Sequence, residues 1–125
     1  MNKKILLIDD EELVVKSIEK LLRKEGYVVV SVRDGESAIR KVADEDFNLI
    51  VTDIRMPQID GIETITKIRE LRRKKGKDQI PEICITGYAE EEVNKKAEVL
   101  GVADYLFKPF DLRDFLACVK KHITA

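Results

Sequence analysis

A chain of 125 residues is long enough to bury a core, and we expect a single domain over residues 1–125. Its 23 basic and 24 acidic residues leave a net charge of −1, which argues against non-specific binding to nucleic acid. No apolar run approaches the roughly 18 residues of a membrane span. The start, MNKKILLIDD, has no small-residue cleavage site, so we expect neither a membrane protein nor a signal peptide.

Strand and helix patterns alternate five times along the chain. Continuous apolar or β-branched runs predict strands, and apolar residues at helical spacing predict helices. The predicted strands cover residues 4–8, 27–32, 49–52, 82–86 and 103–107, and the predicted helices cover residues 11–25, 35–46, 61–75, 90–100 and 112–122. In the last helix, the residues expected to face inward are Leu112, Phe115, Leu116 and Val119.

This alternation predicts an α/β fold with parallel strands and right-handed crossovers. The strands are nearly continuous apolar runs, which indicates that helices cover both faces of the sheet. We therefore expect a doubly wound (βα)5 arrangement, a flavodoxin-like five-stranded parallel sheet with helices on both faces.

The two cysteines fall inside these apolar patterns, Cys84 in a predicted strand and Cys118 in a predicted helix. We expect two buried, reduced thiols rather than a disulfide or a metal site, and hence a cytoplasmic protein. His122 is the only histidine, and we expect it to be solvated or to compensate the helix dipole at the end of the last helix.

Five polar residues stand where the predicted strands end: Asp9, Asp10, Asp53, Thr86 and Lys108. In an open α/β sheet, ligands bind outside the carboxyl ends of the parallel strands. These residues are therefore expected to meet in one crevice, although they are far apart in the sequence. Three carboxylates, a hydroxyl and an amine suit a divalent cation and a phosphoryl group.

The adjacent carboxylates of Asp9 and Asp10 repel one another, and a hard cation such as Mg²⁺ relieves that repulsion. An alternative role for one of them is to cap the helix that follows. Capping suits one carboxylate but does not account for the pair.

Asp53 ends the third predicted strand and precedes a loop in which Pro57 prevents an immediate helix. Gly61 opens the next helix, and a backbone carbonyl near Arg55 is a candidate for a further metal ligand. A carboxylate held beside a cation can attack a phosphoryl group and form an acyl phosphate.

Thr86 offers a hydroxyl donor, and Gly87 beside it leaves room for a phosphate close to the backbone. Lys108 offers an ammonium that can neutralise charge on transferred oxygens. Pro109 is expected to impose a cis or tightly turned bond that directs Lys108 inward.

With these residues assembled, the chain resembles the receiver domains of response regulators in two-component signalling, including the chemotaxis regulators. The resemblance rests on ILLIDDEE, VTDIRMPQIDG, ITGYA and ADYLFKPF, which occur in order and on the expected elements. It implies that Asp53 accepts a phosphoryl group from a histidine kinase. It also implies that Asp10, Asp53 and the Arg55 carbonyl bind Mg²⁺, with Asp9 assisting through the water shell of the metal.

The resemblance further implies that Thr86 and Lys108 contact the phosphoryl oxygens, and that Tyr105 is an aromatic switch residue. The positions that influence phosphate lifetime in this family are Arg55 and Tyr88 here, and neither readily positions a water. We therefore expect slow to moderate self-dephosphorylation, in a phosphoacceptor switch rather than a metabolic enzyme.

The partners implied are a sensor histidine kinase or phosphotransfer protein, and a downstream output domain or protein. The output partner is expected to contact the surface formed by the fourth helix, fifth strand and fifth helix, which can also support a homodimer. The fourth helix has a mixed charged face of Asn94, Lys95, Lys96 and Glu98, which is either simply solvated or part of this contact surface.

Three other functions fit less well or stay open. A haloacid-dehalogenase-type hydrolase needs a second acid two residues after its nucleophile, where this chain has Arg55. A flavin-binding domain needs a phosphate-cradling loop after the first strand, where the acids starting at Asp9 repel phosphate. The chain can also be a receiver from a longer DNA-binding or enzymatic regulator.

Overall fold

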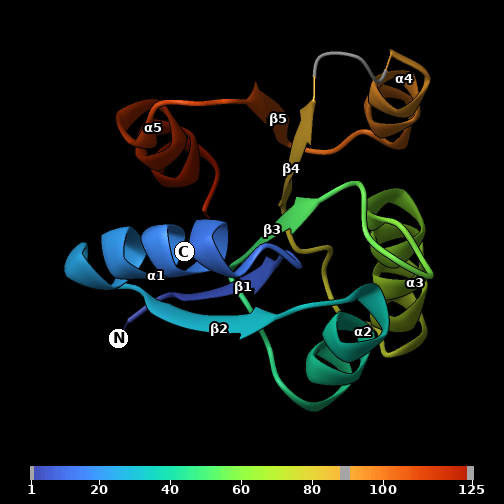
Figure 1. Ribbon diagram of the computed structural model, residues 1–125. Coiled ribbons are helices and arrows are strands. Elements are labelled where there is room, and N and C mark those ends of the chain that lie inside the picture. The colour runs from blue at the N-terminus through green and yellow to red at the C-terminus, as the bar shows by residue number, and fades with distance from the viewer. Residues whose placement is uncertain (1, 88–90, 124–125) are drawn as a thin grey trace.

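The structure, a computed structural model, describes residues 2–87 and 91–123. Strands and helices alternate as the sequence predicts (Figure 1). The strands are β1 (Lys4–Ile8), β2 (Val28–Val32), β3 (Leu49–Asp53), β4 (Glu82–Gly87) and β5 (Asp104–Lys108). The helices are α1 (Glu12–Lys24), α2 (Gly35–Asp44), α3 (Gly61–Lys74), α4 (Glu91–Leu100) and α5 (Leu112–His122).

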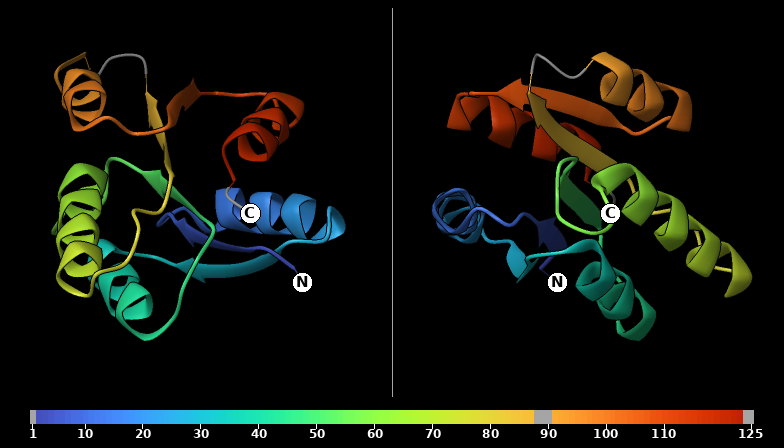
Figure 2. Two further views of the ribbon diagram at one scale, coloured as in Figure 1. Left: turned by 180° about the vertical axis from the view of Figure 1, so that it is seen from behind. Right: turned by 45° about the vertical axis from the view of Figure 1, so that its right-hand side comes forward.

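All strand pairs are parallel, and the sheet order is β2-β1-β3-β4-β5. Helices α1 and α5 cover one face of the sheet, and α2, α3 and α4 cover the other, as two further views show (Figure 2). The predicted doubly wound (βα)5 fold is confirmed. From β1 the chain adds β2 on one side of the sheet and then β3, β4 and β5 on the other. The topological switch point therefore lies between β1 and β3, where a crevice is expected at the carboxyl ends of the strands.

Alternating strand residues divide the core between the two faces. The core under α1 and α5 contains Ile5, Leu7, Ile18, Leu22, Val51, Ile85, Phe115 and Val119. The core under α2 and α3 contains Leu6, Ile8, Ala38, Val42, Ile50 and Ile68. A third cluster, which reaches α4, consists of Ile54, Ile65, Cys84 and Ala97. Both cysteines are buried free thiols, as expected.

Three helices begin at an aspartate whose carboxylate accepts a backbone hydrogen bond near the helix start. These N-caps are Asp34, Asp60 and Asp111, with distances of 2.7–2.8 Å to the amide nitrogens that they cap. Because a cap satisfies an otherwise unpaired amide, it defines where the helix can start. For α3, the cap at Asp60 sets the length of the loop that follows Asp53.

A buried ion pair ties α3 to β4 and to the end of α4. The guanidinium of Arg69 donates to both carboxylate oxygens of Glu82, at 2.9 and 2.8 Å, and the Glu82 side chain is 1% exposed. Arg69 also donates to the carbonyl oxygen of Leu100. These hydrogen bonds give partners to the buried carboxylate of Glu82 and to the backbone carbonyl of Leu100 at the C-terminal end of α4.

Some predicted boundaries and orientations are wrong. Strands β3, β4 and β5 each extend one residue further than expected, to include Asp53, Gly87 and Lys108, because backbone pairing does not depend on the polarity of the side chain. Leu112 was expected to face inward but is 42% exposed and lines a surface groove, because helical spacing defines a buried face only to within part of a turn. Residue 90, predicted to start the fourth helix, lies outside the described residues.

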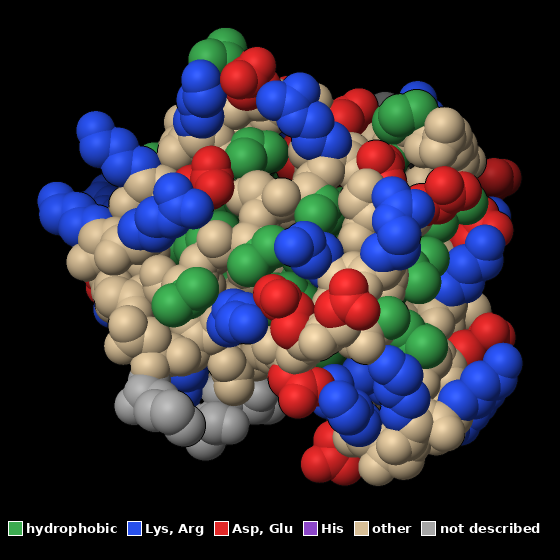
Figure 3. Space-filling model, turned by 90° about the horizontal axis from the view of Figure 1, so that it is seen from below, with side chains coloured by type: hydrophobic (Ala, Val, Ile, Leu, Met, Phe, Trp, Pro, Cys, Tyr) green, Lys and Arg blue, Asp and Glu red, His purple; other side chains and the backbone are tan. Residues whose placement is uncertain are grey.

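Basic and acidic side chains are interspersed over the face shown in Figure 3, with small hydrophobic patches between them. The face carries no large area of one charge, in keeping with the balanced composition. Within the described ranges, none of the helices has both the length and the apolar character needed to cross a membrane.

Candidate functional site

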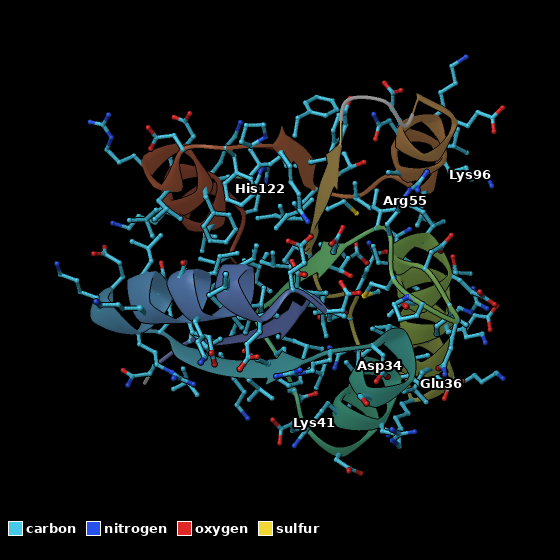
Figure 4. The ribbon with its side chains drawn as sticks, viewed as in Figure 1. Asp34, Glu36, Lys41, Arg55, Lys96 and His122 are labelled. Atoms are coloured by element: carbon cyan, nitrogen blue, oxygen red, sulfur yellow. The ribbon has the colours of Figure 1, made fainter. Side chains whose placement is uncertain are left out.

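Four of the five strand-end residues predicted from the sequence line one pocket of about 330 Å³ at the carboxyl edge of the sheet, and the fifth, Asp9, is buried beside it in a carboxylate cluster. Figure 4 shows Arg55 on the loop that follows β3, on the side of the sheet that carries α3 and α4. The residues that line the pocket are Asp10, Glu11, Asp53, Arg55, Thr86, Gly87 and Lys108. Parallel topology therefore gathers side chains from four strands and the loops after them, as the sequence predicted.

Three carboxylates form a cluster at this edge. One oxygen each from Asp9, Asp10 and Asp53 lies within 4.8 Å of the others. Asp9 is fully buried and Asp53 is 5% exposed, whereas Asp10 is exposed. The Oδ1 atom of Asp9 accepts a hydrogen bond of 2.9 Å from the Glu11 amide, while its buried Oδ2 atom has no hydrogen-bond partner. The N-cap residue of α1 is Glu11, so the capping role considered for Asp9 or Asp10 is wrong.

Burial makes these carboxylates costly to ionise. It raises the pKa of Asp9 from 3.8 to about 6, and the nearby charge of Asp53 adds to the increase, although the Glu11 amide opposes it. Burial also raises the pKa of Asp53, against the opposing hydrogen bond from Lys108. A buried carboxylate oxygen without a partner and clustered negative charge are what a hard divalent cation compensates. The residues present therefore fit Mg²⁺.

Lys108 reaches into the pocket from the end of β5. Its Nζ atom lies 2.9 Å from Oδ2 of Asp53 and 3.0 Å from Oε1 of Glu11. Partial burial works against the charged form, but these two hydrogen bonds raise the pKa of Lys108 above its usual range, so the amine is protonated. The bond between Lys108 and Pro109 is cis, one of the two geometries expected. The sequence analysis did not predict Glu11 as a residue of this pocket, although Glu11 directly follows the acidic pair Asp9 and Asp10.

Gly61 allows the start of α3 to pack directly against the end of β3. A Cβ atom there would lie 2.5 Å from the carbonyl oxygen of Asp53 and 2.9 Å from Cα of Ile54. The Gly61 amide donates a hydrogen bond of 2.7 Å to the Ile54 carbonyl. No side chain fits this approach, so glycine is required beside Asp53. Pro57 is exposed in the intervening loop.

Thr86 is buried at the end of β4, and among the described residues its hydroxyl makes a long contact of 3.4 Å to the carbonyl oxygen of Gly87. Apart from its chain neighbours, a Cβ atom added to Gly87 would meet none of the described residues within 4 Å, and Gly87 lines the pocket. Both observations agree with the expected place for a phosphate, a hydroxyl donor beside an accessible backbone.

Tyr105 does not line the pocket, but it lies on the same face of the sheet as Thr86. It is the register partner of Cys84, and alternate residues of a strand share a face. Its ring packs against the cluster that contains Ala97 of α4, and it contacts Phe107 edge to face at 5.5 Å between centroids. Phe107 is in turn the register partner of Thr86, a link that sequence reasoning missed.

Two other expectations need correction. His122 is not simply solvated, because its Nε2 atom lies 3.0 Å from Oδ2 of Asp104. Asn94, expected on a charged face, has a buried Oδ1 atom with no hydrogen-bond partner, because α4 turns this residue toward the protein. Both errors concern the rotation of helices against the sheet, which spacing alone does not define. Tyr88, an expected lifetime residue, lies outside the described residues.

Comparison with known proteins agrees with this geometry. Residues 5–120 match the family described as the response regulator receiver domain. The chain is 39% identical over 120 residues to the alkaline phosphatase synthesis regulator PhoP of Bacillus subtilis, covering 96% of this chain and 48% of that protein. It is 32% identical to protein PilG of Pseudomonas aeruginosa, covering 98% of this chain and 88% of that one. The chain spans about half the length or less of several of these curated relatives.

Solved structures show the same fold. A CheY-like receiver domain protein from Methanospirillum hungatei is 31% identical, with a TM-score of 0.86 over 97% of this chain and 93% of its own. The receiver domain of a sensor histidine kinase from Pseudomonas aeruginosa is 28% identical, with a TM-score of 0.84 over the full length of both chains. That structure has a magnesium ion coordinated in its active site cleft. From its sequence, fold and strand-end site together, this chain belongs to the response regulator receiver domain family.

Proposed function

We propose that Asp53 is the phosphoryl acceptor of this receiver domain. The single observation that carries the proposal is the pairing of its buried carboxylate with the Lys108 ammonium at 2.9 Å in the pocket. A carboxylate oxygen of Asp53 attacks the phosphorus of a phosphohistidine. The P–O bond forms as the P–N bond breaks, and the imidazole leaves with the bonding electron pair. The product is an acyl phosphate on Asp53.

Asp9, Asp10, Asp53 and the backbone carbonyl of Arg55 are the residues that would hold Mg²⁺. The unpartnered Oδ2 atom of Asp9 and the three clustered carboxylates support this assignment. When bound, the cation supplies positive charge that offsets the charge on the transferred oxygens.

Lys108 and Thr86 are proposed to contact the phosphoryl group directly. Lys108 already pairs with Asp53, so its ammonium can pass to the phosphoryl oxygens once the Asp53 oxygen forms its new bond. The Thr86 hydroxyl makes a long contact in the described structure and can donate a shorter, stronger hydrogen bond to an anionic oxygen. The open backbone at Gly87 leaves space for that oxygen.

The switch is proposed to run from Thr86 to Tyr105 and then to α4. The register of β4 and β5 places Thr86, Phe107 and Tyr105 on one face, and Tyr105 packs on the cluster containing Ala97. Movement of Thr86 toward phosphate changes the space beside these rings. The output partner, or a second copy of the chain, is proposed to contact α4, β5 and α5, where Figure 4 shows Lys96 projecting from α4.

The domain is proposed to act as a switch with only limited autophosphorylation and autodephosphorylation. Arg55 is neither a carboxylate nor an amide, so it does not readily position an attacking water. A time course of phosphate release for the wild type and Arg55→Asn tests this, and decay of the wild-type acyl phosphate within seconds contradicts it. The two buried free thiols favour a reducing compartment, so we place the protein in the cytoplasm.

An apolar groove beside the pocket supports delivery of phosphate by a protein. Its volume is about 610 Å³, and Lys108 lines both the groove and the pocket. Leu13, at its rim, is 82% exposed, which is unusual for a large apolar side chain. We place the kinase or phosphotransfer protein here, because its phosphohistidine must reach Asp53 next to Lys108.

The central test is phosphorylation of the purified chain by a small phosphodonor in the presence and absence of Mg²⁺. The wild type should gain one phosphoryl group, detected by intact mass, and Asp53→Asn should gain none. Asp114→Asn, which removes an exposed carboxylate from α5, is the matched control and should behave as the wild type. Equal modification of the wild type and Asp53→Asn refutes the assignment.

The groove is tested separately with Leu13→Asp. This variant should be phosphorylated by the small donor at the wild-type rate but should accept phosphate much more slowly from a phosphohistidine protein. Val99→Asp, at an 89% exposed apolar position on α4, is the control and should leave both rates unchanged. An equal loss with both donors would mean that Leu13 matters for the pocket and not for docking.

A further inference from the structure

A second cluster of metal-ligating side chains lies on β5 and α5, outside the carboxylate site. Asp104 begins β5, and Cys118 and His122 lie four residues apart on α5. Oδ2 of Asp104 is 3.0 Å from Nε2 of His122 and 3.5 Å from Sγ of Cys118. All three ligand atoms lie within 4.8 Å of one another. His122 is on the side of α5 that faces β5 (Figure 4).

The two distances from Asp104 are close to those of a tetrahedral site. With Zn–S of about 2.3 Å and Zn–N and Zn–O of about 2.0–2.2 Å, ligand atoms stand roughly 3.3–3.6 Å apart. The distance of 3.5 Å from Asp104 to Cys118 lies within this range, and the distance of 3.0 Å to His122 falls short of it by a few tenths of an ångström. Three protein ligands leave one position for water or another ligand.

The ligands are also held in place by the fold. Residues four apart on a helix share a face, so Cys118 and His122 both point toward β5. The second carboxylate oxygen of Asp104, Oδ1, accepts a hydrogen bond of 2.9 Å from the Tyr105 amide, which leaves Oδ2 directed at the other two ligands. Outer hydrogen bonds of this kind orient metal ligands. The side chain of Asp104 is 41% exposed, so an ion has a path from solvent.

We propose that Asp104, Cys118 and His122 form a second cation site, selective for a borderline-soft divalent metal such as Zn²⁺. Thiolate and imidazole donors favour such metals over Mg²⁺, whereas the all-oxygen cluster at Asp53 favours Mg²⁺. The site joins β5 to the last turn of α5. It does not depend on the phosphoacceptor role proposed for Asp53.

The competing interpretation is a hydrogen-bonded triad without metal. Burial and the Asp104 carboxylate raise the pKa of the Cys118 thiol to about 12, so the metal-free chain holds a protonated thiol here. The imidazole and the thiol can then both donate to Asp104. Metal binding replaces both hydrogen bonds and releases the thiol proton.

The test is titration of the EDTA-treated full chain with Co²⁺ in excess Mg²⁺, followed by displacement with Zn²⁺. Binding at this site should give a near-ultraviolet thiolate-to-cobalt absorption band that saturates at one Co²⁺ per chain. The band should be lost in Cys118→Ser, and affinity should fall by at least about tenfold in His122→Gln. Cys84→Ser is the matched control and should retain the band, as should Asp53→Asn.

A second measurement needs no variant. Zn²⁺ should slow alkylation of Cys118 in the wild type, as judged by peptide mapping, without changing the alkylation of Cys84. Absence of a thiolate band, a band that persists in Cys118→Ser, or unprotected Cys118 would overturn the proposal in favour of the hydrogen-bonded triad. If Asp53→Asn keeps Zn²⁺ binding but the wild type fails to take up phosphate, the proposed function fails while this site stands.

Discussion

The Asp9→Asn substitution should stabilise the metal-free protein while removing its stabilisation by Mg²⁺. Asp9 is fully buried, and one of its oxygens has no hydrogen-bond partner. Each tenfold change in an ionisation constant corresponds to about 1.4 kcal/mol, so a rise of the pKa from 3.8 to about 6 costs about 3 kcal/mol at neutral pH. Asparagine removes that charge and can still accept the hydrogen bond from the Glu11 amide.

The net gain is expected to be about 1–3 kcal/mol, because the amide group of asparagine brings a donor to a position that has no partner. The assay is urea unfolding at pH 7.5 in EDTA and again in Mg²⁺. Asp10→Asn removes the same charge from an exposed neighbour and should change the free energy of unfolding in EDTA by no more than about 0.5 kcal/mol.

The pH dependence supplies a second check with a definite sign. Between about pH 6 and pH 4 the folded wild type holds a proton on Asp9 that the unfolded chain lacks, so the contribution of Asp9 to the free energy of unfolding rises as the pH falls. The advantage of Asp9→Asn should therefore shrink between pH 7.5 and pH 4.5. A variant that is less stable than the wild type in EDTA at pH 7.5 would refute the argument that the buried charge of Asp9 is the dominant cost.

Three further predictions concern the site and its support. Mg²⁺ affinity, measured by calorimetry, should fall as the pH drops through about 6, because Asp9 must be ionised to act as a ligand. Gly61→Ala should lower the free energy of unfolding by about 1–3 kcal/mol and slow phosphorylation, because the added Cβ displaces the backbone at Asp53. Arg69→Met should cost about 3–5 kcal/mol by leaving buried Glu82 unpaired, and adding Glu82→Leu should recover most of that loss; chemical denaturation measures both.

The amino-acid sequence by itself determined the fold class and most residues of the strand-end pocket, although not Glu11. Apolar runs and helical spacing are local signals, so they predict which segments become strands and helices. Parallel topology then brings the carboxyl ends of the strands to one edge, so the convergence of Asp10, Asp53, Thr86 and Lys108 could be predicted without coordinates.

Only the tertiary structure decided which side chains pair across that framework. The contacts of Lys108 with Glu11 and of His122 with Asp104 join residues whose distance depends on how each helix is rotated and docked on the sheet. Helical spacing defines a face only to within part of a turn, so Leu112 proved exposed and Asn94 proved turned inward. Local periodicity therefore specified the elements and their order, whereas packing between elements distant in sequence specified the ion pairs, the buried unpartnered oxygen of Asp9 and the cluster around Asp104.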